Sequence, residues 1–143
     1  MSAKINFLDL LPEKHKSVQV YPGETLFQKG DRAVAVYVVK SGKLEIFDGD
    51  GVYETVGPGD LLGEMALIDK APRSASVRAV SECAVAPIDA QKFITMIESH
   101  TGFGIAVMRV LVRRLRAMDE RAIRKRSGRD RRQRDRRAKQ SPA

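Results

Sequence analysis

Residues 61–79 read LLGEMALIDKAPRSASVRA, and this stretch decides the fold and the site that the sequence predicts. It is apolar enough to belong to a core, yet it holds the carboxylate of Glu64 and, nine residues later, the guanidinium of Arg73. Buried charges are costly unless they are paired or bound to something. The two groups therefore either form an ion pair that closes a loop, or each serves to bind part of a ligand.

The residues around the two charges indicate which ligand would suit them. Gly63 allows a ligand to approach the backbone closely, and GEMALI is long enough for about one helical turn, whose free amides attract anions. Arg73 can hold a phosphate through two parallel hydrogen bonds, and the small Ser74 and Ala75 leave room for that group. Glu64 is an acceptor and suits a hydroxyl. Together these residues fit a sugar phosphate, with the ion pair as the alternative.

Upstream of this stretch, short runs rich in Val, Tyr, Phe and Ile alternate with turn signals such as Pro-Gly, Asp-Gly and Gly-Pro-Gly-Asp. Short strands separated in this way indicate an antiparallel sandwich or barrel. The Asp-Gly signals between residues 44–47 and 52–56 predict a hairpin. Two more strands are expected at residues 74–80 and 83–88. The predicted fold class is mainly β with flanking helices.

Helical spacing is found on both sides of this β region. A short N-terminal helix is predicted from the spacing of Ile5, Leu8 and Leu11. A second helix is expected after Asp89, which suits an N-cap. Its apolar side would hold Phe93, Ile94 and Ile97. Gly102 and Gly104 are expected to interrupt the chain before a long helix that runs from about residue 105 into the 120s.

The long helix carries an apolar seam with spacings of three and four residues, namely Met108, Leu111, Leu115, Met118 and Ala122. Arginines occupy much of the remaining helix surface, so little apolar surface exists beyond this narrow stripe. The helix could pack on its own β domain or on the same helix of a second copy. Of these two arrangements, the sequence favours a homodimer through this helix.

The net charge of +8 is unevenly distributed along the chain. Residues 1–112 hold 12 Lys/Arg and 14 Asp/Glu, whereas residues 113–143 hold 14 and 4. We therefore predict a domain over residues 1–124 and an Arg-rich, disordered tail over residues 125–143. The tail could be a solubilising end without a specific role. It could instead bind nucleic acid or an acidic protein through its charge, or grip a cyclic dinucleotide such as cyclic di-GMP with its arginines.

Length and composition exclude several classes of protein. A chain of 143 residues suits about one domain. It has no apolar run near the roughly 20 residues of a membrane span and no signal-peptide pattern. Its single cysteine, Cys83, excludes an internal disulfide framework and a cysteine-based zinc cluster. His15 and His100 are expected at the surface, and no catalytic residue is predicted. We expect a cytoplasmic protein that is not an enzyme and binds no metal.

Residues 63–67 and 72–77 resemble the phosphate-binding cassette of the cyclic nucleotide-binding domain family. That family includes regulatory subunits of cyclic-nucleotide-dependent kinases, cyclic-nucleotide-gated channels and bacterial catabolite activator proteins. The resemblance covers roughly residues 7 to 120. Further matching segments lie in the family's order and spacing at Tyr21-Pro22-Gly23-Glu24, Phe27, Lys29-Gly30-Asp31, Ser41-Gly42-Lys43-Leu44-Glu45 and Gly59-Asp60.

The resemblance implies an eight-stranded, jelly-roll-like β-roll flanked by helices, the last of which acts as a lid and often as a dimer interface. It also implies that Glu64 accepts a hydrogen bond from the ribose 2′-hydroxyl and that Arg73 neutralises the cyclic phosphate. Ser74 and its neighbour would donate backbone amides to that phosphate, and the amides after Gly63 would close the other side. The implied cofactor-binding residues are Gly63, Glu64, Met65, Ala66, Arg73, Ser74 and Ala75.

The sequence departs from the family pattern in base recognition and at the C-terminus. Catabolite activators carry a Thr-Ser pair on the long helix that contacts adenine, whereas Met118-Asp119 stand at that place here. Relatives that prefer cGMP carry a Thr where Ser74 stands. We therefore expect only a modest preference for cAMP over cGMP. About 20 residues follow Arg124, too few for a helix-turn-helix domain, so a stand-alone sensor or adaptor is predicted.

Overall fold

A computed structural model describes the backbone of residues 6–140 and the side chains of residues 6–120. The chain divides into two compact units, Met1–Leu111 and Val112–Ala143. Every strand of the described part belongs to the first unit, and the helix α3 (Thr101–Gln140) begins in the first unit and continues into the second. The boundary that the sequence predicted at residue 124 therefore lies within a helix.

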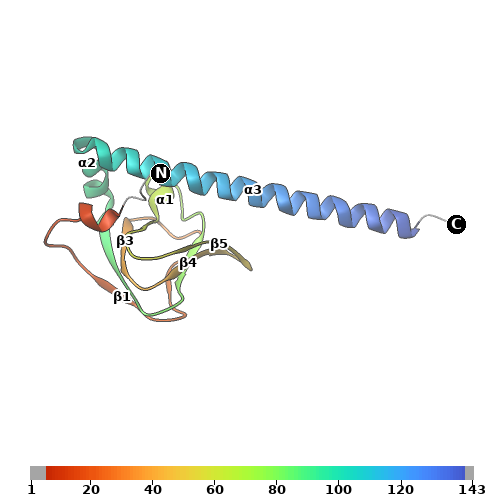
Figure 1. Ribbon diagram of the computed structural model, residues 1–143, viewed down its shortest axis with the longest axis horizontal. Helices are drawn as coiled ribbons and strands as arrows, with labels where there is room; N and C mark the ends of the chain where they lie inside the picture. The colour runs from red at the N-terminus through yellow and green to blue at the C-terminus, as the bar shows by residue number, and fades with distance from the viewer. Residues whose placement is uncertain (1–5, 141–143) are drawn as a thin grey trace. The chain divides into compact units, whose positions relative to one another are not determined.

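Within residues 6–140, eight strands form two antiparallel sheets (Figure 1). One sheet has the order β1-β8-β3-β6 and the other has the order β2-β7-β4-β5. This arrangement with its flanking helices confirms the mainly β fold class. The strands are β1 (Val18–Val20), β2 (Thr25–Phe27), β3 (Ala35–Ser41), β4 (Leu44–Asp48), β5 (Gly51–Val56), β6 (Leu61–Leu62), β7 (Ser76–Ala79) and β8 (Cys83–Asp89).

The strand β3 separates two apolar clusters, because successive side chains of a strand point to opposite faces. Val36 and Val38 belong to the cluster that also contains helical residues, whereas Val39 belongs to the cluster between the two sheets. Tyr37 packs against the same inter-sheet cluster. Because both faces of β3 are covered, its sequence reads as a continuous apolar run rather than an alternating one.

The predicted hairpin is confirmed as β4 and β5, which pair from Leu44 with Val56 to Asp48 with Gly51. The register shifts between Ile46 and Phe47, so the hairpin contains a bulge. The two strands expected at residues 74–80 and 83–88 are β7 and β8. The strand β7 begins at Ser76, two residues later than predicted, because residues 73–75 form the loop that leads into it.

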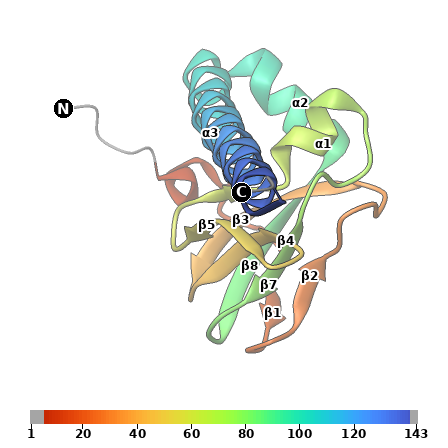
Figure 2. The same cartoon turned by 90° about the vertical axis from the view of Figure 1, so that its right-hand side faces the viewer.

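Two helices lie at the same end of the strands (Figure 2). The short helix α1 (Glu64–Asp69) follows Gly63, and α2 (Ala90–Ser99) follows β8. Asp89 caps α2 as predicted, because its side chain accepts a hydrogen bond from the Lys92 amide at 2.8 Å. Of the apolar residues expected on one side of α2, Phe93 is buried, whereas Ile94 is 40% exposed.

The N-terminal element is a 3-10 helix, η1 (Phe7–Leu10), rather than an α-helix. Its buried residue is Phe7, which the spacing of Ile5, Leu8 and Leu11 did not predict, and Ile5 lies outside the described residues. The ring of Phe7 meets Phe103 edge-on at 5.9 Å, and Phe103 meets Phe93 edge-on at 5.7 Å. Such edge-to-face pairs are favourable, so three aromatic rings join η1, α2 and α3.

The helix α3 begins at Thr101, so the expectation that Gly102 and Gly104 interrupt the chain was wrong. Packing overrides their low helix propensity, because Phe103 between them is 1% exposed. The ring nitrogen Nδ1 of His100 also accepts a hydrogen bond from the Phe103 amide at 3.1 Å, as an N-cap side chain does. The backbone of α3 continues to Gln140, where the sequence predicted a disordered tail. Arg, Lys, Gln and Ala, which dominate that segment, all favour helix.

Candidate functional site

Two charged residues of the quoted stretch, Glu64 and Arg73, are buried. Glu64 is the first residue of α1 and is 1% exposed, and Arg73 lies in the loop before β7 and is 4% exposed. The strand β6 ends at Leu62, the chain turns at Gly63, and α1 starts at Glu64. This sharp strand-to-helix turn brings a carboxylate and a guanidinium into the same interior region.

The guanidinium of Arg73 is held by backbone carbonyl oxygens. Its Nη1 donates to the carbonyl oxygen of Gly63 at 2.8 Å, and its Nη2 donates to that of Ala35 at 2.6 Å. Its Nε is buried and has no hydrogen-bond partner among the described residues. The hydrogen bonds of Arg73 therefore do not go to the Glu64 carboxylate. Carbonyl oxygens orient a guanidinium but do not neutralise its charge.

Two aromatic rings also contact Arg73. Its Cζ lies 4.0 Å from the ring centroid of Phe27 and 6.0 Å from that of Tyr37. The two rings stack on each other with an interplanar angle of 26°. A guanidinium over an aromatic face gains a cation–π attraction. Phe27 was predictable from the sequence only as a match to the family, and its contact with Arg73 was not, because the two residues lie far apart in the chain.

Burial lowers the pKa of Arg73, since a charged group loses its hydration in the interior. The nearby ionisable groups of Tyr37, Glu64 and Asp31 act in the opposite direction and raise that pKa. The guanidinium therefore carries a positive charge at a place that is poorly solvated. A bound anion would compensate this charge better than the carbonyl oxygens of Gly63 and Ala35 do.

Gly63 is required by the geometry of the site for two reasons. Its φ angle of 83° lies in the left-handed region, which side chains other than glycine rarely adopt. A Cβ atom at this position would also collide with Nη1 of Arg73. Both the backbone turn and the position of the guanidinium therefore require that residue 63 has no side chain.

The loop between β2 and β3 fixes the backbone of Arg73. The Arg73 amide donates to the carbonyl oxygen of Asp31 at 2.8 Å, and the Gly30 amide donates to the carbonyl oxygen of Arg73 at 2.9 Å. The Lys29 amide adds a hydrogen bond to Oγ of Ser76 at 2.9 Å. The Lys-Gly-Asp turn that the sequence identified thus holds the segment that carries Arg73.

The other predicted binding residues lie in the same two segments. Ala66 and Ala75 are each 5% exposed, Met65 is half-buried and Ser74 is exposed. The structure therefore places the predicted set around the turn at Gly63 and the loop at Arg73. Their contacts with a ligand stay a prediction.

The part of the chain that the structure describes offers few alternatives to this site. It contains no helix that is both long and apolar enough to cross a membrane. Its His, Cys, Asp and Glu side chains form no group of three that could hold a metal ion. Cys83 is buried.

The aromatic contact of Arg73 leads to a prediction. Replacing Phe27 with Leu should weaken the binding of an anionic ligand by about 0.5–2 kcal/mol, because the cation–π contact positions the guanidinium. Phe27→Tyr should restore most of the affinity. Calorimetric titration with cAMP measures both variants. The matched control is Phe47→Leu, since Phe47 lies under Arg78 at 4.2 Å on the sheet and should not affect binding. Equal losses in the two Leu variants would contradict the assigned role.

Comparison with known families identifies the matching domain. Residues 17–100 match the family model described as the cyclic nucleotide-binding domain. The match contains both cassette segments and all eight strands.

Curated relatives share this part of the chain. The chain is 33% identical over 107 residues to a cyclic AMP receptor protein of Thermus thermophilus. The match covers 71% of this chain and 50% of the relative. It is also 29% identical over 108 residues to a lysophospholipase of Emericella nidulans. That match covers 72% of this chain but only 7% of the enzyme. The chain thus spans half or less of these relatives.

Solved structures show the same fold. The catabolite activator protein of Thermus thermophilus superposes with a TM-score of 0.66 at 30% identity, covering 73% of this chain and 52% of that one. An EAL enzyme in its cAMP-bound form superposes with a TM-score of 0.59 at 30% identity, covering 76% of this chain and 30% of that one.

Proposed function

This chain belongs to the cyclic nucleotide-binding domain family, and from that membership we propose that it binds a cyclic mononucleotide between the turn at Gly63 and the loop at Arg73. The observation that carries the proposal is the buried guanidinium of Arg73, whose side-chain hydrogen bonds go to two carbonyl oxygens. A cyclic phosphate carries the single negative charge that would neutralise this guanidinium. Binding of the nucleotide, and not catalysis, is the proposed activity.

The other residues of the site have separate roles in this proposal. The Glu64 carboxylate accepts a hydrogen bond from the ribose 2′-hydroxyl. The backbone amides of Ser74 and Ala75 donate to the phosphate, as do the amides that follow Gly63. Ser74 is exposed, so its hydroxyl can turn toward a ligand without breaking a core contact.

We favour cAMP over cGMP as the natural ligand. The Thermus thermophilus relative is named for cyclic AMP. Solved forms of the EAL enzyme carry cAMP or cGMP, at 30% and 32% identity respectively, so the shared framework accommodates both bases. The Thr-Ser pair that contacts adenine in catabolite activators is replaced by Met118-Asp119, and base selectivity is therefore expected to be modest.

The role of Glu64 provides the test of the proposal. Glu64→Gln should weaken cAMP binding by about 1–3 kcal/mol, because a charged acceptor for the 2′-hydroxyl is replaced by a neutral one. It should hardly change the binding of 2′-deoxy-cAMP, which lacks that hydroxyl. Calorimetric titration of both nucleotides against the parent and the variant measures the interaction energy between Glu64 and the 2′-hydroxyl. If the parent binds no cyclic mononucleotide, the proposed function is wrong, and if both nucleotides lose equally, only the assignment of Glu64 is wrong.

We further propose that the chain is a sensor or adaptor that signals through α3 as a homodimer. The exposed apolar residues of α3 follow spacings of three, four and three residues, which suit a helix pair: Ile105, Met108, Val112 and Leu115 are 44%, 60%, 48% and 49% exposed. Leu111 of the predicted seam packs instead against the core of its own unit. The proposed interface therefore keeps Met108 and Leu115 and adds Ile105 and Val112.

The dimer can be tested at these exposed positions. Val112→Glu combined with Leu115→Glu should convert a dimer into a monomer, because four like charges would meet in the interface. Light scattering gives the mass directly. The matched control is Val34→Glu with Val80→Glu, two exposed valines outside α3, which should leave the mass unchanged. If the parent protein is already a monomer, the proposed dimer is wrong.

An alternative function rests on the basic end of the chain. Residues 113–143 hold 14 basic and 4 acidic residues, and one solved form of the EAL enzyme carries both cAMP and cyclic di-GMP. The Arg-rich end would bind cyclic di-GMP, nucleic acid or an acidic protein by charge. Titration of the full chain with cyclic di-GMP and with a DNA duplex, at two salt concentrations, separates this function from cassette binding. Binding that is not displaced by cAMP and that weakens steeply with salt would support it.

A further inference from the structure

The ring of Tyr37 lies beside the buried guanidinium of Arg73. Its centroid is 6.0 Å from Cζ of Arg73, and it stacks on the ring of Phe27 with 6.1 Å between the two centroids. The ring of Phe27 in turn has its centroid 4.0 Å from the same Cζ atom. The phenol ring of Tyr37 is therefore held in place by a neighbour that itself packs on the guanidinium.

The backbone around Tyr37 also holds the guanidinium of Arg73. Nη2 of Arg73 donates to the carbonyl oxygen of Ala35, which precedes Tyr37 by two residues in β3. Nη1 donates to the carbonyl oxygen of Gly63. Gly63 directly follows Leu62, and Leu62 pairs with Tyr37 across β3 and β6. Both backbone positions that hold the guanidinium therefore adjoin Tyr37, one along its own strand and one across the sheet.

The hydroxyl of Tyr37 is available to a ligand. Tyr37 is half-buried, and its hydroxyl oxygen has no hydrogen-bond partner among the described residues and remains accessible to solvent. Burial lowers the pKa of Arg73, and among the neighbours that raise this pKa Tyr37 has the largest effect. Because a Coulomb interaction weakens with distance, the phenol oxygen lies close to the guanidinium. An O–H donor without a partner in the described residues therefore lies next to a buried cation.

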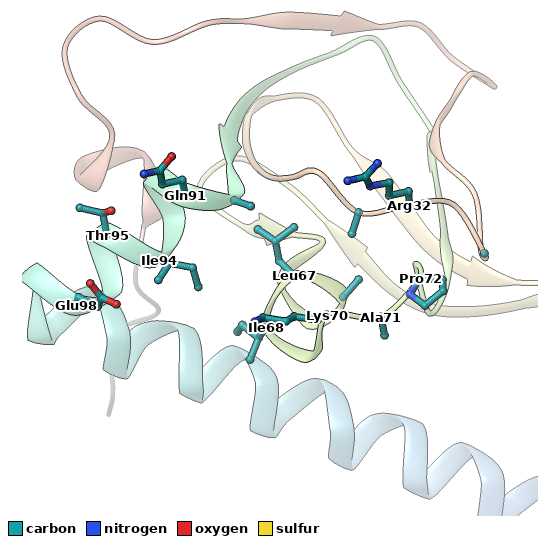
Figure 3. A pocket seen from close by; sticks show the side chains of 14 residues that line it. Arg32, Leu67, Ile68, Lys70, Ala71, Pro72, Gln91, Ile94, Thr95 and Glu98 are labelled. Carbon is teal, nitrogen blue, oxygen red and sulfur yellow. The ribbon is translucent and has the colours of Figure 1, made fainter.

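The hollow between α1 and α2 is a different place from the surroundings of Arg73. It has a volume of about 880 Å³, and the loop before β3 forms its third wall (Figure 3). Neither Arg73 nor Tyr37 lines it. Its two basic residues, Arg32 and Lys70, lie on different sides of Leu67 (Figure 3). A phosphate bound by Arg73 therefore lies outside this hollow, and its further contacts come from the residues around the guanidinium.

We propose that Tyr37 is a further phosphate-binding residue, whose hydroxyl donates a hydrogen bond to one exocyclic oxygen of the cyclic phosphate that Arg73 binds. This assignment rests on the proposed function. A phosphate oxygen is an ionised acceptor, and O–H donors form short and strong hydrogen bonds to such acceptors. Phe27 holds the phenol ring before the ligand arrives, so little side-chain freedom is lost on binding. Two donors from different segments, one charged and one neutral, thus orient the phosphate.

Tyr37→Phe tests the assignment, because it removes the hydroxyl and keeps the ring that stacks on Phe27. In calorimetric titration of the full chain, this variant should bind cAMP about tenfold to a hundredfold more weakly than the parent, as expected for a lost hydrogen bond to a charged group. Thermal melting checks that the variant is folded.

The phosphorothioate analogues Sp-cAMPS and Rp-cAMPS show which atom the hydroxyl contacts. Each analogue carries sulfur in place of one of the two exocyclic oxygens, and sulfur is a weak hydrogen-bond acceptor. Tyr37→Phe should weaken the binding of one analogue as much as that of cAMP. It should hardly change the binding of the other analogue, whose sulfur occupies the position that the hydroxyl contacts. A loss of folding stability alone would affect both analogues equally.

The matched control is Tyr53→Phe. Tyr53 is another half-buried tyrosine that packs against the inter-sheet cluster, and it is not among the groups that act on Arg73. This variant should leave the ratio of the affinities for the two analogues unchanged. If Tyr37→Phe binds cAMP as tightly as the parent, or loses affinity equally for cAMP and both analogues, the phosphate contact of Tyr37 is wrong while the proposed function stands. A parent that binds no cyclic mononucleotide would overturn both.

Discussion

Arg73→Ala should reduce the affinity for cAMP by about 2–5 kcal/mol, the usual loss when one partner of a desolvated charge pair is removed. This corresponds to roughly a thirtyfold to several-thousandfold increase in Kd. Arg73 is 4% exposed and its Nε has no partner in the described residues, so a bound phosphate would meet a guanidinium with a hydrogen-bond donor still available. Calorimetric titration of cAMP against the parent and the variant measures the loss.

The matched control for this substitution is Arg78→Ala. Arg78 also stacks on a phenylalanine, with its Cζ 4.2 Å from the Phe47 ring, and pairs with Glu45 at 3.2 Å. Its side chain is 42% exposed, so it resembles Arg73 in contacts but not in burial. Arg78→Ala should leave cAMP affinity unchanged. A cAMP affinity that is the same in Arg73→Ala and in the parent would show that the nucleotide binds elsewhere.

Gly42→Ala should lower the free energy of unfolding by roughly 2–5 kcal/mol, combining the cost of a left-handed residue with that of overpacking. The φ angle of Gly42 is 83°, and a Cβ there would collide with the carbonyl oxygen of Glu82 and lie 2.6 Å from Sγ and 2.8 Å from Cα of Cys83. Two of these atoms are backbone atoms at the start of β8, so they cannot turn away as a side chain can. Urea unfolding monitored by circular dichroism measures the change.

Gly23→Ala separates the two contributions. Gly23 has nearly the same φ angle, 84°, but a Cβ there would have no atom within 4 Å. This variant should lose only about 1–2 kcal/mol, the cost of the left-handed conformation. The difference between the two variants therefore measures the collision at Gly42. Equal losses would mean that the turn between β3 and β4 can move away from β8.

Patterns along the sequence predicted the secondary-structure elements that are determined by interactions between residues close in the chain. The hairpin of β4 and β5 follows from Asp-Gly signals between two apolar runs, and the cap at Asp89 follows from one side chain and one amide three residues later. The start of α3 was predicted four residues too late, because two glycines indicate a break while the packing of Phe103 decides otherwise. Propensity is a weak guide where a buried side chain lies between the unfavourable residues.

The site was predictable in its residues but not in its geometry. The quoted stretch indicates that Glu64 and Arg73 are buried, and both are. The partners of Arg73 come from β2 and β3, through the ring of Phe27 and the carbonyl oxygen of Ala35. No spacing along the chain connects these residues with Arg73, because only the pairing of the sheets brings them together.

The edge-on contact between Phe7 and Phe103 has a consequence for the rate of folding. It joins the first described element of the unit to α3, with all of the described strands between them in the chain. Closing so long a loop is entropically costly until the intervening strands have paired. The contact should therefore form late, after the transition state for folding. Interactions that form late slow unfolding without accelerating folding, so the three-ring cluster determines mainly how long the unit stays folded once it has formed.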